Sequence, residues 1–553
     1  MNRAFLALVL SAFTLLCGSV FGQGDHQHQH DTSEKIGRAN FKISCSPHSQ
    51  MQFNRAVAWL HSFEYEEAEK LFTAIAADEP QCAMAYWGIA MSNYHTIWVA
   101  PTKEELNKGS AAIGKAKAAG ARTARERAFI EALEVFFKDA ERHDHRTRTL
   151  AYSDAMGTVY NSDPSDIEAS VFYALTLIAK GMMTDDKTYA DQKTAARILN
   201  HVLTLEPEHP GVTHYLIHSY DYPALANLAL PAARRYAAIA PASAHARHMP
   251  SHIFIRLGLW PEAVRSNLDA KAAAKAFAAR NGMKAVWDEE FHAMDYLAYA
   301  YLQDSDDRRA LGVVNELNLM GKADPETFKV AYAYTAIPAR YALERRQWKE
   351  AARLTLAPDA LGGFPWQRFT WAGAHITFAR AVGMARTGDT ASARKEIETL
   401  AAVRQQLSAN SGNYDWGKQV EIEHGVASAW LAYADGNRQE AIRLMRAAAD
   451  LDDATDKHPV TPGSILPPRE QLGELLLEIN DPAAALAEYE NSLKSTPNRF
   501  QGVYGAARAA ERSGDRRKAR IYYSKLVELS GKGDTVRPEI VEAKEFLSRQ
   551  KGR

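Results

Sequence analysis

One pattern limits what this chain can fold into more than any other: a set of residue types that returns after 34 positions. Ala485 and Tyr489 recur as Ala519 and Tyr523, and Pro497 follows the first pair. Small residues at fixed points let two helices approach closely, and a proline ends the second helix. Because one such unit cannot bury its own apolar face, the pattern predicts a stack of helix pairs that share a continuous core.

The same marks return along most of the chain. Small residues open further second helices at Ala68, Ala195, Ala263, Ala310, Ala351 and Ala441, and the turn Gly388-Asp389 precedes another. This period and pattern resemble those of the tetratricopeptide repeat (TPR) family. The resemblance implies an all-α fold, a right-handed superhelical solenoid of antiparallel helix pairs, with a concave groove that binds a peptide or protein partner.

Four segments carry a narrower resemblance. They are Cys82–Gly88, His214–Tyr222, His245–Trp260 and Lys457–Arg469. Together they resemble a group of largely uncharacterised exported bacterial TPR proteins. This likeness implies a fold and a compartment but no settled activity.

The N-terminus has the features of a secretory signal. A positive start precedes a nearly unbroken apolar run from Ala4 to Cys17, which is too short to span a bilayer. Residues 1–22 are therefore predicted to be a signal peptide, and the mature chain is expected to begin at Gln23, to be periplasmic or secreted, and to lack a transmembrane segment. The alternative is lipidation of Cys17, although Leu16 stands where such signals prefer a small residue.

The mature chain is expected to have three parts. Residues 23–47 are predicted to form a histidine-rich, disordered arm. Residues 48–330 are predicted to form an N-terminal TPR-like solenoid with a His/Asp-lined groove, and residues 331–553 a C-terminal one. Within the second, the segment 452–469 holds four prolines, so we expect a long loop there on the binding face.

Charge and cysteine content narrow the function classes. Lys plus Arg number 66 and Asp plus Glu number 67, so the basic excess that holds a nucleic-acid backbone is missing and nucleic acid is not expected as a partner. Without Cys17, the mature chain keeps Cys45 and Cys82, which an oxidising compartment favours as a disulfide. The alternative is two buried free thiols.

Histidine and aspartate gather in the middle of the chain. Counted in the TPR register, the first helices of three consecutive units point these side chains into one concavity. The candidate metal ligands are His214, His218, Asp221, His245, His248, His252, His292 and Asp295. Tyr222, Arg256 and Tyr299 fall at further groove positions. Pro250 interrupts the second stripe and is expected to kink or restart its helix.

Crowded imidazoles need a reason, because they repel one another when charged and bury poorly unless paired. A divalent metal removes the conflict, since neutral imidazole and carboxylate are ligands of Zn, Cu, Mn and Fe. Two ions, or one ion with an outer shell of hydrogen-bonded partners, both fit the number of candidates. A peptide groove without metal, or plain packing, are the alternatives.

Two functions therefore stand beside each other. The first is an exported TPR scaffold that presents its groove to a peptide or protein partner, with a His/Asp metal site in that groove. The alternative is a metal-dependent enzyme or metal-binding protein that uses the histidine cluster. The sequence signatures of a nucleophile elbow, a dinucleotide fingerprint and a His-Glu-x-x-His helix are missing.

Overall fold

The computed structural model describes residues 35–95, 97, 99–184, 186–356, 361–407, 414–533 and 537–551. The predicted signal peptide with Cys17 and the first part of the predicted arm lie outside these residues. From Lys35 onward the chain forms one unit.

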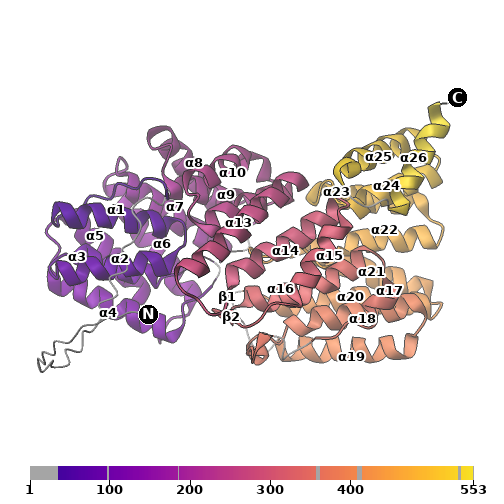
Figure 1. The fold of residues 1–553 in the computed structure, drawn as a ribbon, viewed down its shortest axis with the longest axis horizontal. Helices are drawn as coiled ribbons and strands as arrows, with labels where there is room; N and C mark the ends of the chain where they lie inside the picture. The colour runs from indigo at the N-terminus through magenta and orange to yellow at the C-terminus, as the bar shows by residue number, and fades with distance from the viewer. Residues whose placement is uncertain are drawn as a thin grey trace, which may run out of the picture. The chain divides into compact units, whose positions relative to one another are not determined.

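Helices make up nearly all of the regular structure in this unit (Figure 1). The first half contains α1 (Pro47–His61), α2 (Tyr65–Asp78), α3 (Ala83–Ser92), α4 (Lys103–Ala119), α5 (Ala124–Phe137), α6 (His145–Ser162), α7 (Ile167–Met182), α8 (Ala190–Leu205), α9 (Pro210–Tyr220), α10 (Ala226–Ile239), α11 (Ala244–His248), α12 (Pro250–Arg256), α13 (Trp260–Arg280), α14 (Asp288–Gln303) and α15 (Asp307–Leu317).

The second half continues in the same manner. It contains α16 (Phe328–Glu344), α17 (Trp348–Ala351), α18 (Ala372–Thr387), α19 (Thr390–Leu407), α20 (Trp416–Ala434), α21 (Arg438–Ala454), α22 (Pro468–Glu478), α23 (Pro482–Ser495), α24 (Phe500–Arg512), α25 (Arg516–Leu529) and α26 (Pro538–Lys551), with short 3-10 turns at Trp366–Arg368 and Ser530–Lys532. Two short strands, β1 (Val286–Trp287) and β2 (Ala323–Asp324), pair in parallel and join the connections before α14 and α16.

The helices form stacked antiparallel pairs. Each helix packs on the next along the chain, and alternate helices such as α14, α16, α18 and α20 also pack on one another as an inner layer. Inner α14 is buried along nearly its whole length, whereas outer α15 buries a single stripe, Asp307, Ala310, Val313 and Leu317, at helical spacing. The predicted all-α, superhelical solenoid of helix pairs is confirmed.

The repeat residues act as the pattern predicts. The ring of Tyr489 lies between two inner helices at glycines: a Cβ atom at Gly505 would lie 2.1 Å from this ring, and one at Gly473 would lie 2.7 Å from it. Ala485 and Ala519 are fully buried where their helices meet the preceding one. The small residues are therefore required by close helix contact, which explains why they recur.

The concave side of the solenoid is filled in two places. Helix α1 packs on α9, and α14 packs on α24, although each of these pairs is far apart in sequence. Trp260 Nε1 also donates to the carbonyl of Asn498 at 2.9 Å. At these helices the groove predicted from the TPR register is closed, because inner helices contact each other across it. What remains of the groove there is an interior with cavities.

The packing does not divide the chain at residue 330. Helix α16 (Phe328–Glu344) runs through the predicted boundary and packs closely on α14. Arg537 donates to Asp307 and to the carbonyl of Leu302. The two predicted solenoids are one continuous array over the described residues, because the inner layer runs through without a gap.

Residues 35–47 differ from the predicted disordered arm. Phe41 is fully buried and contacts the rings of Trp87 and Phe129 at centroid distances of 5.2 and 4.8 Å. Its backbone N–H donates to Asn54 Oδ1 at 3.1 Å. The prediction was wrong for this part of the arm because Ile36 and Phe41 supply apolar anchors that pack on the first helices.

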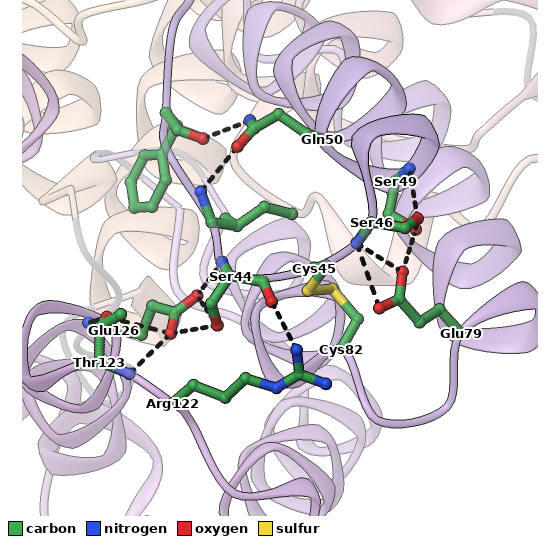
Figure 2. The surroundings of a disulfide bond; sticks show 12 residues. Ser44, Cys45, Ser46, Ser49, Gln50, Glu79, Cys82, Arg122, Thr123 and Glu126 are labelled. Carbon is green, nitrogen blue, oxygen red and sulfur yellow. Dashed lines mark hydrogen bonds between the residues drawn. A yellow bond between two sulfur atoms is a disulfide. The ribbon is translucent and has the colours of Figure 1, made fainter.

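Figure 2 shows the disulfide that joins Cys45 to Cys82, with an S–S distance of 2.07 Å. It ties the segment before α1 to the start of α3. Beside it, the backbone N–H and hydroxyl of Ser44 donate to Glu126 at 2.6 and 2.8 Å. Among the described residues, no helix has both the length and the apolar character that a bilayer crossing requires.

Candidate metal centre

Four inner helices supply six histidines to one region. Helix α9 begins at Pro210 and carries His214 and His218 one turn apart. Helix α11 carries His245 and His248. Pro250 restarts the helix as α12, which carries His252, and α14 carries His292. The restart at Pro250 was predicted, because a proline has no N–H to donate and fits best in a first helical turn.

His214, His218 and His245 form what we call the first histidine set. Their nearest ring nitrogens lie within 4.8 Å of one another. The Nε2 atom of His214 lies 3.0 Å from Nε2 of His245 and 3.0 Å from Nε2 of His218. His214 Nδ1 lies 2.7 Å from the carbonyl oxygen of His61. Because a carbonyl can only accept, Nδ1 carries the proton and Nε2 presents a lone pair to its two neighbours.

His248, His252 and His292 form the second histidine set, again with one nitrogen each within 4.8 Å. The Nε2 atoms of His248 and His252 lie 3.0 Å apart. His248 Nδ1 lies 2.7 Å from Asn267 Oδ1. The amide orientation of Asn267 is fixed because its Nδ2 donates to the carbonyl of Ala263 at 2.8 Å. His248 therefore carries its proton on Nδ1 and has a free lone pair on Nε2.

Asp221 determines the proton position on His252. Its Oδ2 lies 3.0 Å from His252 Nδ1, and its Oδ1 accepts from Arg256 Nε at 2.8 Å. Lys457 Nζ lies 3.7 Å from the same carboxylate. Burial alone would raise the pKa of Asp221, but Lys457, Arg256 and His252 hold that pKa well below its ordinary value. Asp221 is thus an ionised acceptor that keeps the His252 proton on Nδ1 and leaves Nε2 unprotonated.

The second set therefore contains two Nε2 acceptors that face each other. Nε2 of His248 and Nε2 of His252 are 3.0 Å apart, and both rings already donate their Nδ1 protons elsewhere. Tyr296 Oη also lies 3.3 Å from His252 Nε2 and can donate to it. A proton between the two rings would relieve their repulsion, but burial lowers the pKa of both rings. Two nitrogens bound to one tetrahedral zinc ion lie roughly 3.3 Å apart, so the spacing and the tautomers are compatible with metal ligands.

The first set also contains more close nitrogen contacts than it can form hydrogen bonds. The single lone pair on His214 Nε2 can accept a proton from only one of its two neighbouring nitrogens. Burial lowers the pKa of His214 to about 3 and holds those of His218 and His245 well below the ordinary value. At least one nitrogen pair in each set therefore lacks the separate donor and acceptor that a full hydrogen bond needs.

The remaining predicted residues lie outside the two sets. Asp295 pairs at 2.5 Å with the guanidinium of Arg340, a buried cation that requires a counter-charge. Burial raises the pKa of Asp295. Tyr299, predicted for the groove, accepts from Arg499 Nη1 at 2.8 Å in the core. Tyr222 and Arg256 do line a cavity, beside Asp221.

A third cluster was missed by the sequence analysis. His61 Nε2 and His209 Nε2 lie 3.0 and 3.3 Å from the two oxygens of Glu168, and His61 Nδ1 lies 3.0 Å from Tyr215 Oη. We call His61, Glu168 and His209 the carboxylate-linked cluster. Glu168 is 107 positions from His61 and 41 positions from His209. No local spacing could therefore have indicated this cluster.

Two cavities reach the histidine sets. A small one of about 160 Å³ is lined by His218, Asp221 and Lys457. A large one of about 770 Å³ is lined by His245, His252 and His292. Each set therefore has at least one ring on a cavity wall, although all six side chains are at least nine-tenths buried.

The proline-rich segment 452–469 lies against Asp221 and against α16. Lys457 approaches Asp221, and the carbonyl of Gly463 accepts from Arg340 Nη2 at 3.1 Å and from Tyr332 Oη at 3.3 Å. Burial lowers the pKa of Lys457 to about 8, although Asp221 opposes this effect. The loop predicted for the binding face thus contacts the residue that supports His252.

No family model and no curated protein matches this chain. Three solved structures of TPR-type helical repeat proteins are similar to it. They are the human IFIT1 dimer with m7Gppp-AAAA (TM-score 0.38, 10% identity, 88% of this chain and 96% of that chain), yeast Tom70 (0.33, 13%, 85% and 96%) and the APC/C hetero-tetramer Cut9-Hcn1 (0.28, 11%, 91% and 96%). The fold assignment is based on the helix pairing of this chain itself.

Proposed function

We propose that this chain is a metal-binding protein that holds transition-metal ions in two neighbouring three-histidine sites inside a helical-repeat scaffold. The single observation that supports this best is the approach of His248 Nε2 to His252 Nε2 at 3.0 Å while both Nδ1 protons are committed to other acceptors. Supporting groups such as Asp221 and Asn267 are the outer-shell partners that metal-bound histidines ordinarily have.

The donor set narrows the metal. Among Zn, Cu, Mn and Fe, an all-imidazole site favours Zn or Cu, because Mn prefers oxygen ligands and Cu and Zn bind nitrogen donors more tightly than Fe. Three protein ligands leave one coordination position open, as in catalytic zinc sites. A metal held in this way lowers the pKa of bound water and polarises carbonyl groups. His245, His252 and His292 line the large cavity, through which a ligand could reach that position.

The proposed location is the periplasm or the extracellular space. The predicted signal peptide supports it, and so does the disulfide between Cys45 and Cys82, since such bonds persist in oxidising compartments. N-terminal sequencing of the protein from periplasmic and culture fractions tests this proposal. A mature chain that begins at Gln23 is expected, and an uncleaved chain in the cytosolic fraction would contradict it.

We also propose a narrower scaffold function, in which a partner binds at one cavity only. A peptide or protein segment cannot lie along an open concave groove where α1 contacts α9 and α14 contacts α24. The large cavity of about 770 Å³ can accept a short segment or side chain. We therefore place partner binding there rather than along the whole inner face.

Elemental analysis of untagged protein tests the metal sites. We expect close to two equivalents of Zn or Cu per chain after purification without chelators. The triple variant H26A/H28A/H30A, which removes the histidines of the N-terminal arm, is expected to retain this metal and so separates the arm from the two sets. Metal-free protein that also fails to take up Zn or Cu on dialysis would refute the proposal.

A further inference from the structure

The large cavity has a strongly uneven charge. Eight carboxyl side chains line it, against three cationic side chains, Lys322, Lys329 and Arg368. Lys329 is already used, because its Nζ lies 3.0 Å from Asp288 and 2.5 Å from Glu289. Glu67 pairs with Lys70 and Glu105 with His95, at 2.6 and 2.9 Å. Carboxyl side chains still outnumber cationic side chains on the cavity wall, and this excess attracts cationic ligands.

The carboxylates of the cavity lie close enough to affect one another. Burial raises the pKa of Glu66, and the neighbouring charges of Asp288, Glu67 and Asp324 raise it further, while Lys70 opposes them. A bound cation would relieve this repulsion.

Aromatic rings form a second part of the same wall. The cavity is lined by Phe63, Tyr65, Phe277, Trp287, Phe328 and Phe369. Phe277 and Trp287 stack at 4.1 Å, so Trp287 is held in a fixed position beside Asp288. Aromatic faces beside carboxylates favour ammonium and guanidinium groups over a hydrated metal ion. The rings attract the cation and also bury the apolar body that carries it.

One histidine ring of the second set also forms part of this wall. His292 is 6% exposed and lines the cavity, and its ring contacts those of His248 and Tyr296 at centroid distances of 4.1 and 5.3 Å. A ligand in the cavity would therefore lie next to the proposed metal.

We infer that the large cavity binds an organic cation, that is, a ligand whose ammonium or guanidinium group is joined to an apolar body, next to the second histidine set. This inference deepens the proposed function, and the closeness of the ligand to a metal rests on that function. The charge preference itself rests on the carboxylates and rings alone.

The test uses the full chain after removal of metal with EDTA and dialysis, so that metal binding and cation binding can fail separately. Isothermal titration calorimetry compares phenethylamine with 2-phenylethanol, which has the same apolar body without the charge, and with phenylacetate. We expect the amine to bind at least about tenfold more tightly than the alcohol, and the anion to show no binding. Equal binding of amine and alcohol, or no binding of the amine, overturns the inference.

Variants locate the effect in the cavity. The double variant E66Q/D324N removes two cavity carboxylates. It is expected to weaken amine binding about tenfold and leave alcohol binding and the thermal midpoint unchanged. The matched control E104Q/D269N removes two exposed carboxylates outside the cavity and is expected to bind the amine like the wild type. If both double variants weaken the amine equally, the cavity is not the site.

A second pair of probes identifies the source of the cation. The blocked tripeptide Ala-Lys-Ala is compared with Ala-Gln-Ala under the same conditions. Selective binding of the lysine peptide together with the amine supports a cavity that accepts peptide side chains as well as free amines. Binding of the amine alone supports a small-molecule ligand and excludes the peptide as source.

Discussion

Two histidine regions lie side by side in this protein and differ in one respect: where the protons are. In the carboxylate-linked cluster, Nε2 of His61 and Nε2 of His209 both donate to Glu168, and Tyr215 donates to the remaining nitrogen of His61. Each of these contacts has one donor and one acceptor. These contacts need no metal ion to satisfy them, and His209 Nδ1 has no hydrogen-bond partner among the described residues.

The second histidine set has the opposite arrangement. His248 and His252 donate outward, to Asn267 and Asp221, and turn two acceptors toward each other. The backbone of His61 connects the carboxylate-linked cluster to the first histidine set, because its carbonyl oxygen accepts from His214 Nδ1. The direction of each Nδ1 proton, rather than the number of histidines, separates the proposed metal site from a structural cluster.

Metal content should separate the two regions most strongly. His252→Gln is expected to remove about one equivalent of bound metal, because it deletes a proposed ligand. Losing an outer-shell partner lowers metal affinity roughly 10- to 100-fold, and losing a ligand should lower that affinity further. His209→Gln removes an equally buried histidine from the carboxylate-linked cluster and should leave the metal content unchanged. Elemental analysis of the two untagged variants checks this. Equal metal loss in both would remove the distinction between the regions.

Carboxylate variants test the same difference through stability. Glu168→Gln should lower the free energy of unfolding by about 2–3 kcal/mol, because buried hydrogen bonds to a charged group are lost. The decrease should be the same with Zn and with EDTA. Asp221→Asn should instead reduce the extra stability that Zn confers, by weakening metal affinity about 10- to 100-fold. Urea unfolding under both conditions measures each effect, and a Zn-dependent loss in Glu168→Gln would contradict the assignment.

The smallest expected difference is in the pH dependence of the metal-free protein. Burial lowers the pKa of His214 to about 3, so the folded protein keeps this ring neutral while the unfolded chain takes up a proton below about pH 6.5. Its contribution to stability is present above pH 6.5 and declines by about 1.4 kcal/mol per pH unit as the pH falls. His214→Gln should reduce the slope by that amount between pH 6.5 and 5.

Glu168 should act in a lower pH range. Burial alone would raise its pKa, but His209 and His61 hold that pKa far below its ordinary value. Its contribution is therefore present above about pH 4.5 and is lost as the pH falls further. Glu168→Gln should change the slope only below about pH 4.5. His201→Gln, at an exposed position on α8, serves as the control for both variants and should change neither range.

Much of the fold could be predicted from the sequence, because the residues that repeat are the ones that the helix contacts require. Ala485, Tyr489 and the glycines beside that ring are required by close helix packing, and the same marks recur at each pair. The continuity of the array through residue 330 and the order of residues 35–47 could not be predicted. Both depend on contacts between distant segments, such as Phe41 with Phe129, which leave no periodic trace.

The candidate site was predicted in part. The register brought the six histidines of α9, α11, α12 and α14 to one region, and the structure places them together in two sets. The roles of the aspartates could not be read from spacing. Asp295 pairs with Arg340, 45 positions away, and Asp221 acts through His252. Counting along a helix gives the direction of a side chain but not which distant group it meets.

The contact between Lys457 and Asp221 has a consequence for the order of assembly. Synthesis has delivered all six histidines once residue 292 has been added, but Lys457 follows only much later along the chain. In the proposed export, every imidazole of the two sets would cross the membrane before Lys457 reaches Asp221. An ion bound at that stage, as proposed for the two sets, would be enclosed only when the proline-rich segment packs on Asp221.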